Sequence, residues 1–355
     1  MAIANTATKW AGVKWTMVMW GALSPYRQER VRLMMHESFH PLQDDLGLSA
    51  RDAVNNHLDT MEGRIWLQME WRALERALRT QGAERKRALE DALYFRAYRR
   101  GLVAMAAANE DALESNEGVC EYTGVKIATL GDVNANLGAQ GGAPGGSREA
   151  ELMAAMDLRQ AHRKQTFVRS FAYVSGPAYG LLLDAARPGW RQGLKGAIEM
   201  GAMAGAAYGV AAAKASPAEA MARAKRYDGE DILAVEKRRE ERRQKELAEA
   251  RKKFVEGPVL VLRPGESFGY SFNPNSVVAV DENSTVYPEL KVTDAWGILN
   301  ADGGAMVVRD KGMITRVVVP APMAGATKGE GWELELKPGW KIVNSDRSGD
   351  VTVSK

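Results

Sequence analysis

The stretch RVRLMMHESFH, residues 30–40, places two histidines four residues apart in a segment of helical character. Residues four apart lie on one face of a helix, one turn from each other, so His36 and His40 can reach a single ion. Glu37 lies between them, where its carboxylate can take a proton from water. Only four histidines occur among the 355 residues, so this spacing is rare by chance. The pattern predicts a metal centre on this helix.

A third ligand is expected further along the chain, because a zinc site needs three protein ligands. No histidine follows His40 at the spacing HxxGxxH that would supply it. In the segment NEGVCEY, residues 116–122, Glu117 and Glu121 are again four residues apart. One carboxylate can bind the ion while the other orients a ligand histidine through its free ring nitrogen. We expect the intervening Cys120 to face the core as a small apolar side chain.

These two segments together resemble the gluzincin zinc metallopeptidases, the group that includes the thermolysin-like enzymes and related aminopeptidases. HESFH resembles their first zinc-binding helix, and NEGVCEY resembles the segment that carries their third ligand. The resemblance implies that His36, His40 and Glu117 bind Zn²⁺. It also implies that Glu37 is the general base, which would take a proton from the attacking water and pass it to the leaving amine.

The same resemblance gives roles to side chains around the ion. It implies that Glu121 orients the first histidine and that Asn116 supports the second. Peptide hydrolysis also needs an electrophilic group that stabilises the oxyanion. Tyr173 and Tyr179 flank a predicted Gly-Pro turn and are our candidates, ranked ahead of His162. His57 remains, and we expect it to be a packed or surface residue.

Pro41 directly follows His40 and bears on whether the site can form. Proline inside a helix removes a hydrogen bond and clashes with the preceding turn. We therefore expect the helix to end or kink at this point. A kink that turned His40 away would leave the centre incomplete.

The whole chain reads as an α+β protein. Residues 1–215 are predicted to form a mostly helical, zincin-like metallopeptidase domain that begins with a half-buried strand or hairpin. Residues 216–256, with interleaved charges at i,i+4 spacing, are expected to form a helical connector. Short β-rich runs separated by Gly, Pro, Asn and Asp fill residues 257–355 and predict a small β-sandwich or barrel.

Composition excludes several other classes of protein. The 48 Lys and Arg nearly balance the 45 Asp and Glu, which gives no reason to expect a nucleic-acid partner. One cysteine excludes intramolecular disulfides, iron–sulfur clusters and thiolate zinc sites. No signal peptide is evident, because Lys9 and Lys14 interrupt the first apolar residues, although an exported form with a removed leader is left open. The Gly-rich residues 131–147 read as a mobile loop, not a P-loop.

The stretch 193–213 is the best candidate for a membrane span. It is mostly Ala and Gly and carries Lys195 and Glu199, so we expect a close-packed helix and no integral membrane segment.

Three functions are consistent with these patterns. The leading one is a zinc-dependent peptidase that acts on peptide or protein substrates. The second is a catalytically inactive, peptidase-like scaffold whose β domain binds a protein or glycan; its candidate contact residues are Tyr270, Tyr287, Trp296, Trp332 and Trp340. The third and weakest is a structural membrane-associated protein that uses residues 193–213.

Overall fold

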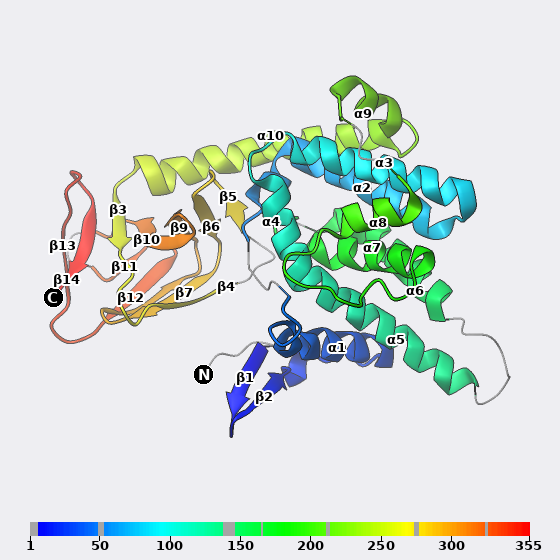
Figure 1. Cartoon of the computed structure of the whole chain (residues 1–355). Helices are drawn as coiled ribbons and strands as arrows, with labels where there is room; N and C mark the ends of the chain where they lie inside the picture. The colour runs from blue at the N-terminus through cyan, green and yellow to red at the C-terminus, as the bar shows by residue number, and fades with distance from the viewer. Residues whose placement is uncertain are drawn as a thin grey trace. The chain divides into compact units, whose positions relative to one another are not determined.

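The computed structural model describes residues 6–48, 53–137, 146–164, 166–210, 214–272, 277–323 and 326–355. The chain divides into two compact units, Met1–Glu236 and Lys237–Lys355. The first is helical with a hairpin at its start, and the second consists mainly of strands (Figure 1). The predicted α+β class is therefore confirmed.

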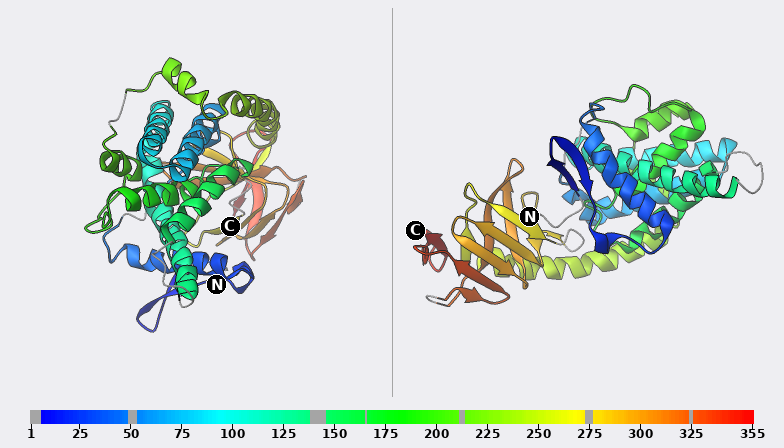
Figure 2. Two further views of the ribbon diagram at one scale, coloured as in Figure 1. Left: turned by 90° about the vertical axis from the view of Figure 1, so that its right-hand side faces the viewer. Right: turned by 90° about the horizontal axis from the view of Figure 1, so that it is seen from below.

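The helical unit starts with a two-stranded hairpin and continues as a bundle of helices (Figure 2). A short helix, η2, precedes α2, and Thr60 lies between the two. Thr60 caps the N-terminus of α2, because its side-chain oxygen accepts a hydrogen bond from the amide of Gly63 at 3.1 Å. The elements are β1 Thr6–Trp10, β2 Val13–Met17, η1 Trp20–Ala22, α1 Arg27–Gln43, η2 Asn56–Asp59, α2 Met61–Arg79, α3 Gly82–Arg100, α4 Ala106–Leu113, η3 Glu114–Gly118, α5 Val119–Leu137, α6 Gly146–Gln160, η4 Ala161–Arg163, α7 Ala172–Ala186, α8 Met200–Tyr208, α9 Pro217–Ala224 and α10 Gly229–Arg251.

Helix α2 forms the centre of the helical unit. Helices α3, α6 and α7 pack around it, and α1 packs along α5 at the side of the bundle. The side chains of Ile65, Leu67 and Trp71 on α2 are 2% exposed or less. Burial of such side chains is the main source of stability in a bundle of this kind.

The second unit is a sandwich of two sheets with a helical segment on its outer face. Its described residues form a seven-stranded sheet, ordered β13-β14-β3-β10-β9-β6-β5, and a five-stranded sheet, ordered β11-β12-β8-β7-β4. The strands are β3 Val259–Leu262, β4 Gly269–Phe272, β5 Val278–Ala279, β6 Ser284–Tyr287, β7 Leu290–Asp294, β8 Gly297–Ala301, β9 Ala305–Asp310, β10 Met313–Pro320, β11 Lys328–Gly329, β12 Trp332–Leu336, β13 Lys341–Asn344 and β14 Val351–Ser354.

Alternation along β10 shows how the two faces of the larger sheet are used. Val317 and Val319 enter the core between the sheets, together with Leu299 of the smaller sheet. Val318 points the other way and packs with Leu247 of α10 and Phe254 of η5 (Lys252–Glu256). Helical residues of this unit therefore cover an apolar part of the outer face of the larger sheet.

Several predictions at the level of elements need correction. The first strand segment is not half-buried, because Val13 and Trp15 are 54% and 50% exposed. The predicted loop 131–147 begins later than expected, since α5 continues to Leu137; residues 138–145 lie outside the described part. Of the helix expected over residues 193–213, the structure shows Met200–Tyr208. Residues 211–213 lie outside the described part. Across the described helices, none combines the length and apolar character needed to cross a bilayer.

Candidate metal centre

Helix α1 carries both histidines and runs through Pro41 to Gln43. The expectation that the helix ends at His40 is therefore wrong. Proline at this position leaves the carbonyl oxygen of Glu37 without its usual amide donor four residues later. That oxygen lies 3.5 Å from Oγ1 of Thr16 on β2, which supplies a substitute donor. The hairpin thus supports the helix where the proline weakens it.

Glu117 lies in a π-helical turn, η3, between α4 and α5. A π turn contains one more residue per turn than an α-helix and is frequent at functional sites. Glu121 follows on the first turn of α5. Both carboxylates are buried, at 8% and 7% exposure, and face α1.

Glycines let the helices approach closely enough for these contacts. A Cβ on Gly124 of α5 would lie 2.6 Å from the carbonyl oxygen of Arg32 on α1. A Cβ on Gly176 of α7 would lie 2.4 Å from Cα of Gly118. Both distances are shorter than any side chain tolerates, so only glycine permits these two crossings. They bring α1, α5 and α7 together around Glu117.

Three potential ligand atoms meet at the centre of this crossing. His36 Nε2 lies 3.2 Å from His40 Nε2 and 3.3 Å from Glu117 Oε2. The third edge, from His40 Nε2 to Glu117 Oε2, is 3.6 Å. Ligand atoms about 2.0–2.1 Å from a tetrahedral zinc ion lie about 3.3 Å from one another. The three distances of this triangle, formed by His36 Nε2, His40 Nε2 and Glu117 Oε2, and its nitrogen and oxygen donors therefore suit a zinc ion.

Each histidine is held through the ring nitrogen that faces away from the triangle. His36 Nδ1 donates to Glu121 Oε2 at 2.6 Å. Glu121 Oε1 in turn accepts a 2.5 Å ion-pair hydrogen bond from Arg32, whose guanidinium also pairs with Asp157 at 2.8 Å. Placing the proton on Nδ1 leaves the lone pair of Nε2 free for a metal.

The ring of His40 is held in a similar way, but by groups without charge. Its Nδ1 lies 3.0 Å from Gln43 Oε1. Gln43 Nε2 donates to the carbonyl oxygens of Ser115 and Asn116 at 3.1 and 2.9 Å. Asn116, which the resemblance makes a support of His40, has no hydrogen bond to that ring among the described residues; its main-chain carbonyl oxygen accepts from Gln43, which contacts His40.

Electrostatics distinguish the roles of the two acidic residues. Burial raises the pKa of Glu117, but hydrogen bonds from His36, His40 and Tyr173 hold it well below its usual range. Desolvation instead raises the pKa of Glu37, against the charges of the two histidines. Glu117 is thus ionised like a ligand, whereas Glu37 is a stronger base than an ordinary glutamate.

Tyr173 reaches the centre from α7. Its hydroxyl donates to Glu117 Oε2 at 2.7 Å, and its ring stacks on His36 with centroids 5.4 Å apart and planes 10° apart. Burial raises the pKa of Tyr173, with the charge of Glu117 adding to the effect, so the hydroxyl stays protonated.

The structure does not bring Tyr179 to this cluster. The predicted Gly-Pro turn is absent, because α7 runs as one helix through Pro177. Tyr179 is fully buried and donates to Glu70 at 2.7 Å, within an internal network that includes Arg96. His57 pairs with Glu110 at 2.8 Å, and His162 is exposed. Neither lies among the ligand atoms.

Cys120 faces the interior as predicted, but not as a purely apolar side chain. It is fully buried, and its Sγ donates to Asn116 O at 3.0 Å and lies 3.4 Å from His40 Nδ1. Burial raises the pKa of its thiol, so it remains protonated.

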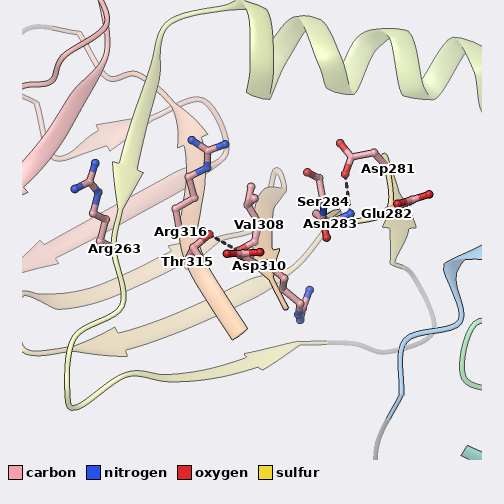
Figure 3. A pocket seen from close by; sticks show the side chains of 10 residues that line it. Arg263, Asp281, Glu282, Asn283, Ser284, Val308, Asp310, Thr315 and Arg316 are labelled. Atoms are coloured by element: carbon pink, nitrogen blue, oxygen red, sulfur yellow. Dashed lines mark hydrogen bonds between the residues drawn. The ribbon is translucent and has the colours of Figure 1, made fainter. Parts of the chain in front are cut away.

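A shallow cavity in the strand-built unit is unrelated to these residues (Figure 3). It combines basic Arg263 and Arg316 with acidic Asp281 and Glu282 on an open surface. Three of the five aromatics suspected of binding a partner, Tyr287, Trp296 and Trp332, are buried at 5% exposure or less.

Among the described residues, the side chains placed to hold a metal are His36 and His40 of α1 and Glu117 of η3. Comparisons with protein-family models, with curated proteins and with solved structures found no match. The geometry of the cluster is accordingly what supports a functional conclusion.

Proposed function

We propose that this protein is a zinc-dependent hydrolase that cleaves peptide bonds. The observation that carries the proposal is the triangle of His36 Nε2, His40 Nε2 and Glu117 Oε2, with edges of 3.2–3.6 Å and Glu37 between the two histidines in sequence. We further propose a zincin-like arrangement for the helical unit, supported by two ligands on one helix and a third ligand from a second helix.

His36, His40 and Glu117 would hold the ion. A bound Zn²⁺ supplies Lewis acidity, which lowers the pKa of water and polarises a carbonyl group. Two neutral imidazoles and one carboxylate leave a net positive charge on the site, which favours that chemistry. The fixed positions of the imidazoles reduce the entropy lost on binding.

Glu37 acts as the proton carrier of the reaction. Its raised pKa lets it take a proton from water and release that proton to the leaving amine. The hydroxyl of Tyr173 remains a donor and stands beside the ligand oxygen of Glu117. From there it can donate to the oxygen on which negative charge develops.

The test begins with metal content. The purified full chain should contain one zinc per molecule, measured by elemental analysis after exhaustive dialysis. Glu117→Ala should lose the metal, since one of three protein ligands is gone. Glu37→Gln should keep it, because Glu37 is not a ligand. A wild-type protein without stoichiometric metal contradicts the proposal.

Activity is measured on a mixture of peptides of random sequence, with cleavage followed by mass spectrometry. Glu37→Gln should lower the rate by about 10²–10⁴-fold at unchanged metal content. Tyr173→Phe should lower kcat more than it changes KM, because the proposed hydrogen bond from its hydroxyl to the developing oxyanion forms in the transition state. Equal rates for wild type and Glu37→Gln would contradict the role given to Glu37.

A further inference from the structure

The hairpin β1–β2 presents its polar side to the protein and its apolar side outward. Cross-strand partners share a face, so Lys9 and Lys14 lie on one side, and Thr16, two residues beyond Lys14, lies on the same side. This side lies against α1, where Lys14 Nζ donates to Pro41 O at 3.2 Å and Thr16 reaches the helix as described above. A surface hairpin with a core behind it normally has the opposite arrangement.

The outward side is aromatic. Trp10 pairs with Val13 across the hairpin, and Trp15 pairs with Thr8. The two tryptophan rings contact edge to face, 6.1 Å apart, yet Trp10 is 70% and Trp15 50% exposed. Trp20, three residues after β2, is 88% exposed. Exposed aromatic groups on this scale indicate an interaction surface.

The tip of the hairpin combines this apolar side with positive charge. Ala11 and Gly12 form the turn with φ of 49° and 80°, which puts Trp10 and Val13 at the tip. Directly behind them Lys9 and Lys14 oppose each other, an arrangement that destabilises an isolated hairpin. Asp45 offsets one of these charges, at 3.1 Å from Lys14, and Lys9 remains exposed.

We propose that this tip inserts into the headgroup region of an anionic phospholipid bilayer. Tryptophan prefers the membrane–water interface, and lysine side chains extend from it to lipid phosphates. Residues 6–28 carry three basic side chains and no acidic one. Insertion leaves Lys9 beside the phosphates and buries Trp10 and Val13 among the acyl chains.

The size of the patch favours lipid over a second protein. A fully exposed aromatic side chain offers about 150–250 Å², so the three tryptophans and Val13 present about 500 Å². A stable protein interface buries about 800 Å² on each partner. Trp10, Val13 and Trp15 project from a two-stranded ribbon, and Trp20 follows it in η1.

The experiment is flotation of the full chain with vesicles. Wild type should float with vesicles of phosphatidylcholine and phosphatidylglycerol, and less with phosphatidylcholine alone. The double variant Trp10→Ser, Val13→Ser should lose at least about tenfold of this binding. Lys9→Glu should lower binding to the anionic vesicles only. Met313→Ser, which removes an apolar side chain that is 72% exposed in the other unit, is the matched control and should bind as wild type does.

The variants should keep the circular dichroism spectrum and metal content of the wild type, since the altered side chains are exposed. Wild type that fails to float with either kind of vesicle overturns the proposal. Equal flotation of wild type and the double variant also overturns it. If the wild type is a dimer without lipid and the double variant is a monomer, the patch is instead a contact between two copies.

Discussion

At the scale of the residue, the candidate centre depends on how its histidines are held. Each ligand ring has one nitrogen directed to the triangle and the other bonded to a fixed acceptor, Glu121 for His36 and Gln43 for His40. Glu121 is charged and anchored by Arg32, whereas Gln43 is neutral. The two rings are therefore expected to differ in their sensitivity to substitution.

Glu121→Gln should lower zinc affinity by about 10–100-fold, because loss of such an acceptor weakens both the orientation and the basicity of the ligand histidine. Competition with a chromogenic chelator measures the change. Asp157→Asn is the matched control: it removes a carboxylate that also pairs with Arg32 but does not contact His36. Equal losses for the two variants would show that the charge of the cluster matters and the hydrogen bond to His36 does not.

As the pH rises, the stability of the metal-free protein should fall while its affinity for zinc increases. Burial alone lowers the pKa of His36, but hydrogen bonds to Glu117 and Glu121 raise it to about 9. The folded pKa exceeds the unfolded value of about 6.5, so this histidine stabilises the metal-free fold below pH 6.5 and loses that contribution as the pH rises toward 9.

Zinc affinity should increase over the same interval, by about tenfold per pH unit, because His36 must release its proton to bind. Thermal unfolding of chelator-treated protein measures the stability, and zinc titrations measure the affinity. Both are carried out between pH 6 and 9.5. A metal-free protein whose stability rises through this range would contradict the raised pKa of His36.

Spacing along the sequence is enough to predict which candidate ligand residues lie together, but not which residues hold them in place. His36, His40, Glu117 and Glu121 lie together because i,i+4 pairs share a helical face. Arg32 follows the same rule, four residues before His36, and could have been predicted. Gln43 and Thr16 could not, since their roles arise from the unusual passage of α1 through a proline. Tyr173 and Tyr179, six residues apart on one helix, cannot face the same way.

At the scale of the element, the centre depends on two helix crossings that exclude side chains. Gly176→Ala would place a Cβ at 2.4 Å from the backbone of Gly118, so α7 and η3 must separate. We expect a loss of about 1–3 kcal/mol in the free energy of unfolding and weaker zinc binding, because Glu117 lies in η3.

Urea denaturation of the two variants provides the measurement. Gly101→Ala is the control, because a Cβ there meets its nearest atoms at an ordinary 3.4 Å. If Gly176→Ala matched this control in both stability and zinc affinity, the crossing would not position Glu117.

Periodicity predicts elements better than it predicts their irregularities. The β-rich composition after Gly257 and the helical patterns before it gave the correct class. The sequence did not predict that the β1–β2 hairpin places its polar side against the protein. Alternation of polar and apolar residues shows that the two faces differ, but it does not show which face is covered. The π turn was missed because counting residues on a helical face assumes 3.6 per turn throughout.

At the scale of the whole molecule, α10 belongs to both units. Glu236 is 2% exposed and accepts hydrogen bonds from Arg64 and Gln68, whereas Leu247 packs on the larger sheet. No residue from 237 to 246, all of them within the described part, is buried. One end of α10 therefore packs in the helical unit, and the other end packs in the strand-built unit.

Thermal unfolding should show two transitions that respond separately to substitutions on α10. Glu236→Ala should destabilise only the helical unit, by about 3–5 kcal/mol, since it leaves the guanidinium of Arg64 with one ion-pair partner fewer. Leu247→Ala should destabilise only the strand-built unit, by about 2–5 kcal/mol. Lys245→Ala lies between them and should change neither. Calorimetry decides: one transition that moves with both substitutions would mean that the two units unfold together.

The π turn at Glu114–Gly118 has a consequence for how this chain tolerates insertions and deletions. Such a turn is equivalent to an α-helix that has accepted one additional residue. A related chain one residue shorter here could form a regular α-helical turn at this place, with the segments before and after it still presenting the same faces. A search pattern for this centre should therefore keep the spacing from Glu117 to Glu121 fixed and let the distance from His40 to Glu117 vary.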